Sequence, residues 1–198
     1  MLSKLASKTA EKFMKNDNTL YDKIEIYQYG FFILYSNLAF LILASIFGAM
    51  FNVLLQSIIF FFMFFSIRQF AGGYHAATET RCDILSTLSI VASIGIIKLS
   101  KIYDFKTILL FITVVSMVLI FFLCPLDKPE KPLSEKEFKY FSKISWIILL
   151  VISSIIIVSY FFKFDILFTP CCVSLILESI LLVAGKIKRV HQEKSVKN

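Results

Sequence analysis

Six long apolar blocks, each nearly free of charge, most constrain what this chain can fold into. They are Phe31–Phe47, Val53–Ile67, Ile84–Ile97, Ile108–Cys124, Trp146–Phe162 and Ile166–Ala184. A chain of 198 residues, 58% of them hydrophobic and 18% charged, could not bury that much contiguous apolar surface in water. In lipid no such burial is needed, because a helix satisfies its own backbone hydrogen bonds. We therefore expect an all-α integral membrane protein that forms a single membrane domain over residues 1–198.

Two of the blocks are short for a membrane-spanning helix. A span takes about 20 residues, with a range of about 17–25, and Val53–Ile67 and Ile84–Ile97 fall below that range. Two interpretations stay open. Either the polar flanks complete both helices, which gives about six short transmembrane helices, or four spans are joined by two partial helices. We favour six spans, and the orientation of the other four is the same in both cases.

The distribution of Lys and Arg predicts the orientation, because these residues resist translocation and collect on the cytosolic side. If six spans start from a cytosolic N-terminus, the 21 Lys and Arg residues all lie on one face except Lys98, Lys101, Lys106 and Lys163. Both termini and the 66–83 and 125–144 connections are then cytosolic. The net charge of +7 follows from this topology and from attraction to anionic headgroups. The lipid bilayer is therefore an expected partner, and nucleic acid is not.

The cytosolic-face segment 1–29 begins with an amphipathic pattern. Apolar side chains recur at helical spacing along residues 1–16, while lysines form a stripe on another face. This pattern is typical of a helix that lies flat on a membrane. The helix is either a membrane anchor or a holder for an amphipathic partner peptide.

The 125–144 connection interrupts the transmembrane core of residues 30–184. It carries three of the four prolines, together with Lys128 and Lys131, and Ser134 with Glu137 predicts a capping box for a following helix. This connection is either a substrate-docking arm or a solvated linker. After the core, residues 185–198 form a basic cytosolic tail.

The 66–83 connection concentrates the residues that could carry chemistry. It contains the run Arg68-Gln69-Phe70-Ala71-Gly72-Gly73-Tyr74-His75, with Cys82 seven residues later. Thr80 followed by Asp83 fits a capping box, which predicts Thr80 as N-cap and Cys82 as the second helical residue. Free N–H groups and the helix dipole stabilise a thiolate at that position. Cys82 is then a nucleophile; the alternative is a small apolar residue at a helix start.

The presence of His75 favours the interpretation of Cys82 as a nucleophile. A histidine near a thiol can deprotonate it and later protonate a leaving amine. Seven residues of continuous helix rise about 10.5 Å and keep the two side chains out of hydrogen-bond range. The pair therefore closes across a turn around Ala76–Glu79 or between two subunits, and an N-cap at Thr80 favours the turn. Gly72 and Gly73 give the backbone freedom for a turn or for close approach of a peptide.

The other reactive residues give weaker signals. Cys124 ends a span on the cytosolic face and is a rival nucleophile, whereas Cys171 and Cys172 lie inside an apolar block. No His/Cys cluster supplies the four ligands of zinc, so neither a metal nor a cofactor is expected. Glu178 is an acid inside a span, and it marks either an ion path in a transporter or a packed or interfacial carboxylate.

At these residues the sequence resembles the accessory gene regulator B family of bacterial quorum-sensing peptidases. The likeness covers nearly the whole chain: the basic N-terminus, the short spans, the run from Arg68 to His75, Cys82 and the Cys124-Pro125 junction. The resemblance implies a multi-pass cysteine endopeptidase of the bacterial cell membrane, with His75 and Cys82 as catalytic residues on the cytosolic side. It implies cleavage of the C-terminal part of a short amphipathic signal propeptide and cyclisation of the remainder to a thiolactone or lactone.

The resemblance also suggests which residues assist. Arg68 and Gly73 match positions of the family motif. The candidates for substrate positioning or transition-state stabilisation are Arg68, Gln69, Gly72 and Gly73, and those for substrate docking are Lys128 and Lys131.

Two other functional classes stay open, namely a small polytopic peptide transporter or exporter without peptidase activity and a non-enzymatic membrane scaffold. The signal propeptide is the expected substrate partner. A homodimer is also expected, because small side chains can pack closely between helices in lipid. The residues expected at that contact are Ser86, Ser89 and Ser93.

Overall fold

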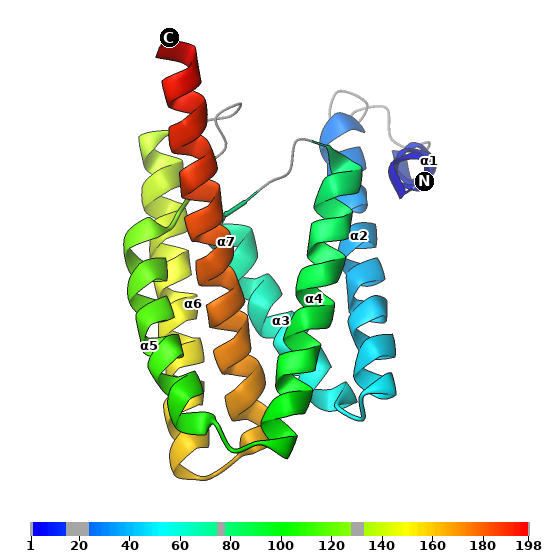
Figure 1. The fold of residues 1–198 in the computed structure, drawn as a ribbon. Helices are drawn as coiled ribbons and strands as arrows, with labels where there is room; N and C mark the ends of the chain where they lie inside the picture. The colour runs from blue at the N-terminus through cyan, green and yellow to red at the C-terminus, as the bar shows by residue number, and fades with distance from the viewer. Residues whose placement is uncertain (1, 15–23, 75–77, 128–132, 198) are drawn as a thin grey trace. The chain divides into compact units, whose positions relative to one another are not determined.

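The computed structural model describes residues 2–14, 24–74, 78–127 and 133–197, and the regular elements in these ranges are all α-helices. In chain order they are α1 (Leu2–Met14), α2 (Ile24–Met50), α3 (Leu54–Ala71), α4 (Glu79–Ile102), α5 (Lys106–Leu123), α6 (Glu135–Phe161) and α7 (Asp165–Lys197) (Figure 1). Six of these helices, α2 to α7, are long and apolar enough to cross a membrane. The prediction of an all-α integral membrane protein is confirmed.

Polar flanks complete the two short apolar blocks. Helix α3 extends beyond Ile67 to Ala71 and has 18 residues, whereas α4 starts at Glu79, ahead of its apolar block, and has 24 residues. At 1.5 Å per residue these helices are about 27 and 36 Å long, close to the roughly 30 Å of the hydrocarbon core. The structure therefore favours six spans over four spans with two partial helices.

Residues 1–43 form one compact unit, which contains α1 and most of α2. The ring of Phe13 lies 6.2 Å from the ring of Tyr27, and the hydroxyl of Tyr35 donates a hydrogen bond to the hydroxyl of Thr9 at 2.9 Å. The side chains of Lys4 and Lys8 are exposed. Helix α1 thus contacts α2 through Phe13 and Thr9, while Lys4 and Lys8 are exposed.

Residues 44–198 form a second unit, built around α7. This helix contacts α3, α4, α5 and α6, and 67% of its most apolar stretch is buried. Small and polar side chains line its contact with α5: the hydroxyl of Ser179 donates to that of Ser116 at 3.0 Å, and Thr113 is fully buried. Small residues let helices approach closely in lipid. Helix α7 is therefore the central helix of this unit, and α3, α4, α5 and α6 pack against it.

Large apolar side chains cover the outside of these helices. Phe111, Phe122 and Phe161 are 72%, 77% and 77% exposed. An apolar surface of this extent is unusual for a soluble monomer, but it is what a lipid-facing helix requires.

The serine row on α4 is only partly available for a dimer contact. Ser86 and Ser89 are half-buried, but Ser93 is buried within the single chain. The prediction that Ser93 packs against a second subunit is therefore wrong, because its own chain already covers it.

Candidate active site at the α3–α4 connection

Helix α3 ends in a glycine turn. The Gly72 N–H donates to the Arg68 carbonyl at 3.2 Å, and Gly72 and Gly73 have φ angles of 80° and 127°. Such angles favour glycine, because they bring a side chain into steric conflict with the backbone. A Cβ on Gly72 would also collide with the carbonyl oxygen of Leu126, and one on Gly73 with the Arg68 guanidinium. The glycine pair is thus required both by its conformation and by the packing around it.

Residues 72–74, called the strap below, are held by three parts of the unit. The first is the segment after α5: Leu126 forms a short parallel bridge with Gly72, and its N–H donates to the Ala71 carbonyl at 2.8 Å. The second is the Arg68 guanidinium, which donates to the carbonyl oxygens of Gly72 and, at 2.7 Å, of Tyr74. Arg68 therefore links the last turn of α3 to the residue that directly precedes His75.

Helix α7 is the third support of the strap. The Tyr74 N–H donates to the Leu181 carbonyl at 2.9 Å. One turn further along α7, a Cβ on Gly185 would lie 2.9 Å from the carbonyl carbon of Gly73 and from the nitrogen of Tyr74. Another turn on, the Lys188 ammonium lies 5.3 Å from the centre of the Tyr74 ring, which is a cation–π contact. One face of α7 thus contacts the strap at three positions over about two turns.

The segment that pairs with the strap is itself tied to α7. Asp127 forms an ion pair with Arg189, next to Lys188 on α7. The strap therefore lies between α7 and a segment that α7 also holds.

Helix α4 starts two residues earlier than predicted. Thr78 is the N-cap: its backbone is extended, with φ −133° and ψ 150°, and its hydroxyl accepts from the Arg81 N–H at 3.4 Å. The prediction of Thr80 as N-cap is therefore wrong, and Cys82 is the fourth helical residue instead of the second. The Cys82 N–H donates to the Thr78 carbonyl at 3.1 Å. The N–H groups without an intrahelical acceptor belong to the residues before Cys82.

Not all candidate residues fall within the described part of the chain. His75, Lys128 and Lys131 lie outside it, whereas the structure brings Arg68 and the glycine pair together. Gln69 is exposed on the last turn of α3.

The extended Thr78 separates Cys82 from the strap. Because Thr78 is not helical, no continuous helix joins His75 to Cys82. With 3.8 Å between successive Cα atoms, Tyr74 and Thr78 lie at most about 15 Å apart. Helix α4 therefore begins within about 15 Å of the strap, and no unbroken helix keeps His75 and Cys82 apart.

Comparison with known proteins identifies the family. The family model described as Accessory gene regulator B (AgrB) matches residues 6–182. The chain belongs to this family. No solved structure matches it.

Two curated AgrB-like relatives come from Clostridium perfringens. The "Putative AgrB-like protein" of strain SM101 / Type A is 32% identical over 150 residues, which cover 72% of this chain and 68% of the relative. The "Putative AgrB-like protein 2" of strain 13 / Type A is 30% identical over 151 residues, which cover 72% of this chain and 70% of the relative. Membership of the AgrB family supports a part in accessory gene regulation, in the processing of a quorum-sensing peptide.

The four cysteines of this AgrB-family chain differ in their access to solvent. All four are free thiols; Cys82 is partly exposed, whereas Cys124, Cys171 and Cys172 are buried. Burial raises the pKa of the Cys124 thiol from 9.0 to about 11. Because the thiolate is the nucleophilic form, Cys124 has neither the exposure nor the charge state that a nucleophile needs at neutral pH. Cys82 is the stronger candidate.

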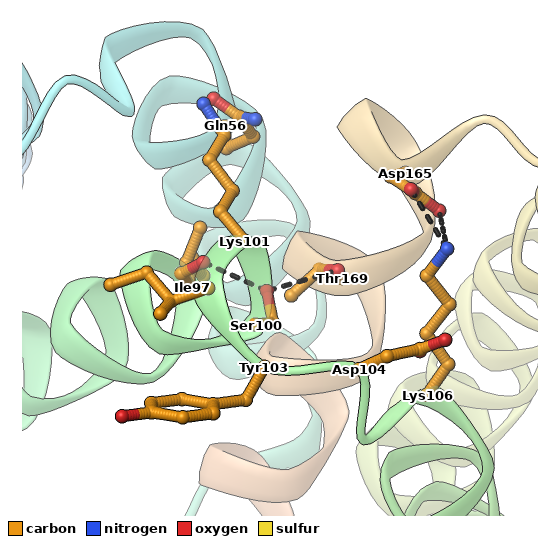
Figure 2. Close-up of a pocket in the computed structure, with 10 residues that line it drawn as sticks. Gln56, Ile97, Ser100, Lys101, Tyr103, Asp104, Lys106, Asp165 and Thr169 are labelled. Atoms are coloured by element: carbon orange, nitrogen blue, oxygen red, sulfur yellow. Dashed lines mark hydrogen bonds and ion pairs between the residues drawn. The ribbon is translucent and has the colours of Figure 1, made fainter.

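A polar cavity of about 400 Å³ lies at the other end of α4 (Figure 2). In it the Ser100 hydroxyl lies 3.4 Å from that of Thr169, and the Lys106 ammonium pairs with Asp165 at 2.8 Å. The 24 residues of α4 separate this cavity from the start of the helix by about 36 Å. None of the described candidate residues lines it, so the cavity is not part of the candidate active site.

Sequence reasoning named Glu178 on α7 but not its partner Arg68. It missed the three positions on α7 that contact the strap, namely Leu181, Gly185 and Lys188. The spacing of three, four and three residues from Glu178 to Lys188 places all four on one helix face. The available signal was this spacing, which starts at the in-span Glu178 and includes one of only six glycines.

Proposed function

We propose that this protein is a membrane cysteine endopeptidase that cleaves the C-terminal part from a short amphipathic signal propeptide and supports closure of the remainder into a thiolactone or lactone ring. One observation carries the proposal. Cys82, the least buried thiol, stands near the start of α4, directly after the connection that contains His75. That connection begins with the strap, which α3, α7 and the segment after α5 hold in place.

The reaction has two acyl-transfer steps. His75 accepts the proton of the Cys82 thiol, and the thiolate attacks the scissile carbonyl carbon. The peptide C–N bond then breaks, the leaving amine takes the proton from His75, and an acyl thioester on Cys82 remains. A cysteine or serine of the bound peptide attacks this thioester, which closes the ring and releases the Cys82 thiol. With a cysteine the exchange is nearly balanced in energy, so it requires no ATP if water is kept out.

The described groups have distinct roles in this mechanism. The Arg68 guanidinium is occupied by the Gly72 and Tyr74 carbonyls, so it positions the strap instead of binding an oxyanion. The N–H groups of Glu79 and Thr80 at the start of α4 are the better oxyanion donors, because the Arg81 and Cys82 N–H groups already donate to Thr78. Gln69 is exposed beside the strap and is placed to contact substrate.

The distribution of basic residues supports a reaction on the cytosolic side of the membrane. Both termini, the strap and Cys82 face the cytosol, because Lys and Arg concentrate in the segments at that side. An amphipathic propeptide would lie along the same surface, where Lys128 and Lys131 are proposed to dock it. The protein is proposed to be a homodimer in which each subunit forms its own His75–Cys82 pair.

The alternative of a peptide transporter is based on Glu178, as part of an ion path, and on the amphipathic N-terminal helix. The Glu178 carboxylate is fully buried and lies 3.7 Å from the Arg68 guanidinium. This ion pair supports the interpretation of Glu178 as a packed carboxylate.

Purified protein in lipid vesicles with a candidate propeptide tests the proposal. Mass spectrometry should find the released C-terminal fragment and, in a sample quenched with acid before the thioester hydrolyses, an acyl group on Cys82. Transport of uncleaved peptide across the vesicle, or no reaction of any kind, would reject the peptidase function.

A further inference from the structure

Glu178 is a buried carboxylate with one cationic partner among the residues that the structure describes. Its side chain is fully buried near the middle of α7, and neither of its oxygens has a hydrogen-bond donor among the described residues. The Arg68 guanidinium, 3.7 Å from one of these oxygens, is its ion-pair partner. A charge in an apolar environment is costly unless it is paired. Glu178 and Arg68 therefore depend on each other.

The same guanidinium contacts the strap. It lies between the Glu178 carboxylate on one side and the carbonyl oxygens of Gly72 and Tyr74 on the other. Arginine can do this because its planar group presents several N–H donors in a fixed arrangement. Glu178 also lies one turn before Leu181, whose carbonyl accepts from the Tyr74 N–H. The carboxylate is thus placed directly behind the point where the strap meets α7.

We propose that Glu178 is a positioning residue for the candidate active site. Its carboxylate holds the guanidinium of Arg68 in place, and this guanidinium holds the strap through its hydrogen bonds. The strap in turn determines where the backbone enters His75. The inference rests on the proposed function. Glu178 contacts neither Cys82 nor the strap backbone in any described interaction, so it acts through Arg68.

Loss of the charge has a defined physical consequence. Without the carboxylate, the Arg68 guanidinium is left as an uncompensated cation at the membrane edge. Its side chain is 20% exposed, and a long arginine can turn its charged end toward headgroups and water. The Gly72 and Tyr74 carbonyls then lose their donor, and the glycine pair, which tolerates many conformations, no longer holds one course.

The test compares Glu178→Gln with wild type in lipid nanodiscs. Glutamine keeps the size of the side chain and removes the charge. Propeptide cleavage should fall roughly 10- to 100-fold, because small displacements of reacting groups have effects of this size. Amide hydrogen exchange at Tyr74 should become faster, since its bond to Leu181 weakens. Ser174→Ala, one turn earlier and equally buried on α7, is the matched control and should change neither quantity.

A second readout separates positioning from a general loss of structure. The rate of Cys82 alkylation by iodoacetamide at neutral pH should drop in Glu178→Gln and in His75→Ala, with no further drop in the double variant. Glu178→Asp retains the charge and should recover part of the cleavage lost in Glu178→Gln. Additive effects of the two changes, or no recovery with aspartate, would overturn the positioning role.

The two proposals fail in different ways. If the wild type cleaves no propeptide while Glu178→Gln still speeds exchange at Tyr74, the peptidase function is rejected and the link from Glu178 to the strap is supported. If cleavage falls in Glu178→Gln while exchange at Tyr74 stays at the wild-type rate, the link is rejected and the peptidase function is supported.

Discussion

The backbone N–H of Tyr74 donates a hydrogen bond to the carbonyl oxygen of Leu181, 2.9 Å away on α7. A helix rarely admits an outside donor to one of its central carbonyls, because the surrounding side chains cover them. Gly185, one turn further on, removes that cover, since a Cβ there would lie 2.9 Å from the Tyr74 nitrogen. The position of the residue before His75 is therefore set by the absence of a side chain on a helix more than 100 residues away in the sequence.

Gly185→Ala should reduce propeptide cleavage by roughly 10- to 100-fold, because the added methyl group pushes the strap off α7. The helix itself should not suffer, since alanine favours helix more than glycine does. Gly95→Ala on α4 is the matched control: a Cβ there meets nothing within 4 Å, so cleavage should stay at the wild-type rate. Equal activity in both variants would show that the contact between the strap and α7 is dispensable.

Arg68→Lys should lose most of the cleavage activity although the positive charge is kept. An ammonium group is a compact charge, and it cannot reach the Glu178 carboxylate and two separate carbonyls with the geometry of a guanidinium. Each hydrogen bond from a charged donor contributes about 1.5–3 kcal/mol, so the loss of one corresponds to roughly a tenfold drop or more. Wild-type cleavage rates in Arg68→Lys would mean that the charge alone is sufficient.

Much of this arrangement could be predicted from the sequence, because it depends on local patterns. The apolar blocks mark the spans, and Ser134 with Glu137 forms the capping box that their spacing predicts. The N-cap of α4 was misplaced because both Thr78 and Thr80 can cap a helix. The acidic residue at the third following position favoured Thr80, whereas the helix starts after Thr78 with Arg81 at that position.

The supports of the strap could not be predicted in the same way. Gly185 follows the last apolar block, so the sequence pattern places it at the start of a tail, whereas α7 continues through it to Lys197. The Arg68–Glu178 pair joins residues 110 positions apart, and no local pattern predicts such a contact. Both features depend on how α3 packs against α7, which is a tertiary relationship.

The pH dependence of thiol labelling should separate Cys82 from Cys124. Burial destabilises the charged thiolate of Cys124, so its pKa rises to about 11 and the thiolate forms only at strongly alkaline pH. In a Cys82→Ala protein, iodoacetamide at about pH 8 should leave Cys124 unlabelled, and labelling should grow as the pH approaches about 11. The same Cys82→Ala change should abolish cleavage, whereas Cys124→Ala should retain it. The reverse pattern of activity would make Cys124 the nucleophile.

The strap before α4 and the residue after α4 should react on opposite sides of the membrane. We expect a Tyr74→Cys side chain, in a Cys82→Ala background, to resist an impermeant maleimide in intact cells and to react after permeabilisation. Tyr103→Cys in the same background should react in intact cells, because Tyr103 is 64% exposed just beyond the other end of α4. Labelling of the Tyr74 position in intact cells would reverse the proposed orientation.

The last prediction concerns whether one subunit supplies both catalytic residues. Proton transfer requires His75 and Cys82 to approach to roughly 3 Å, and apo structures are often looser. The extended backbone of Thr78 excludes a continuous helix between them, which would have held them about 10.5 Å apart. A chain that turns between the strap and α4 can bring the two side chains together within one subunit.

A mixture of His75→Ala and Cys82→Ala proteins in the same nanodiscs measures this directly. We expect no cleavage, because each subunit of a mixed dimer would lack one member of its own pair. Wild type diluted with Cys82→Ala protein is the control, and its activity should fall in proportion to the wild-type fraction. Cleavage by the mixture of the two variants would show instead that His75 of one subunit serves Cys82 of the other, and the strap would then have to direct His75 across the dimer contact.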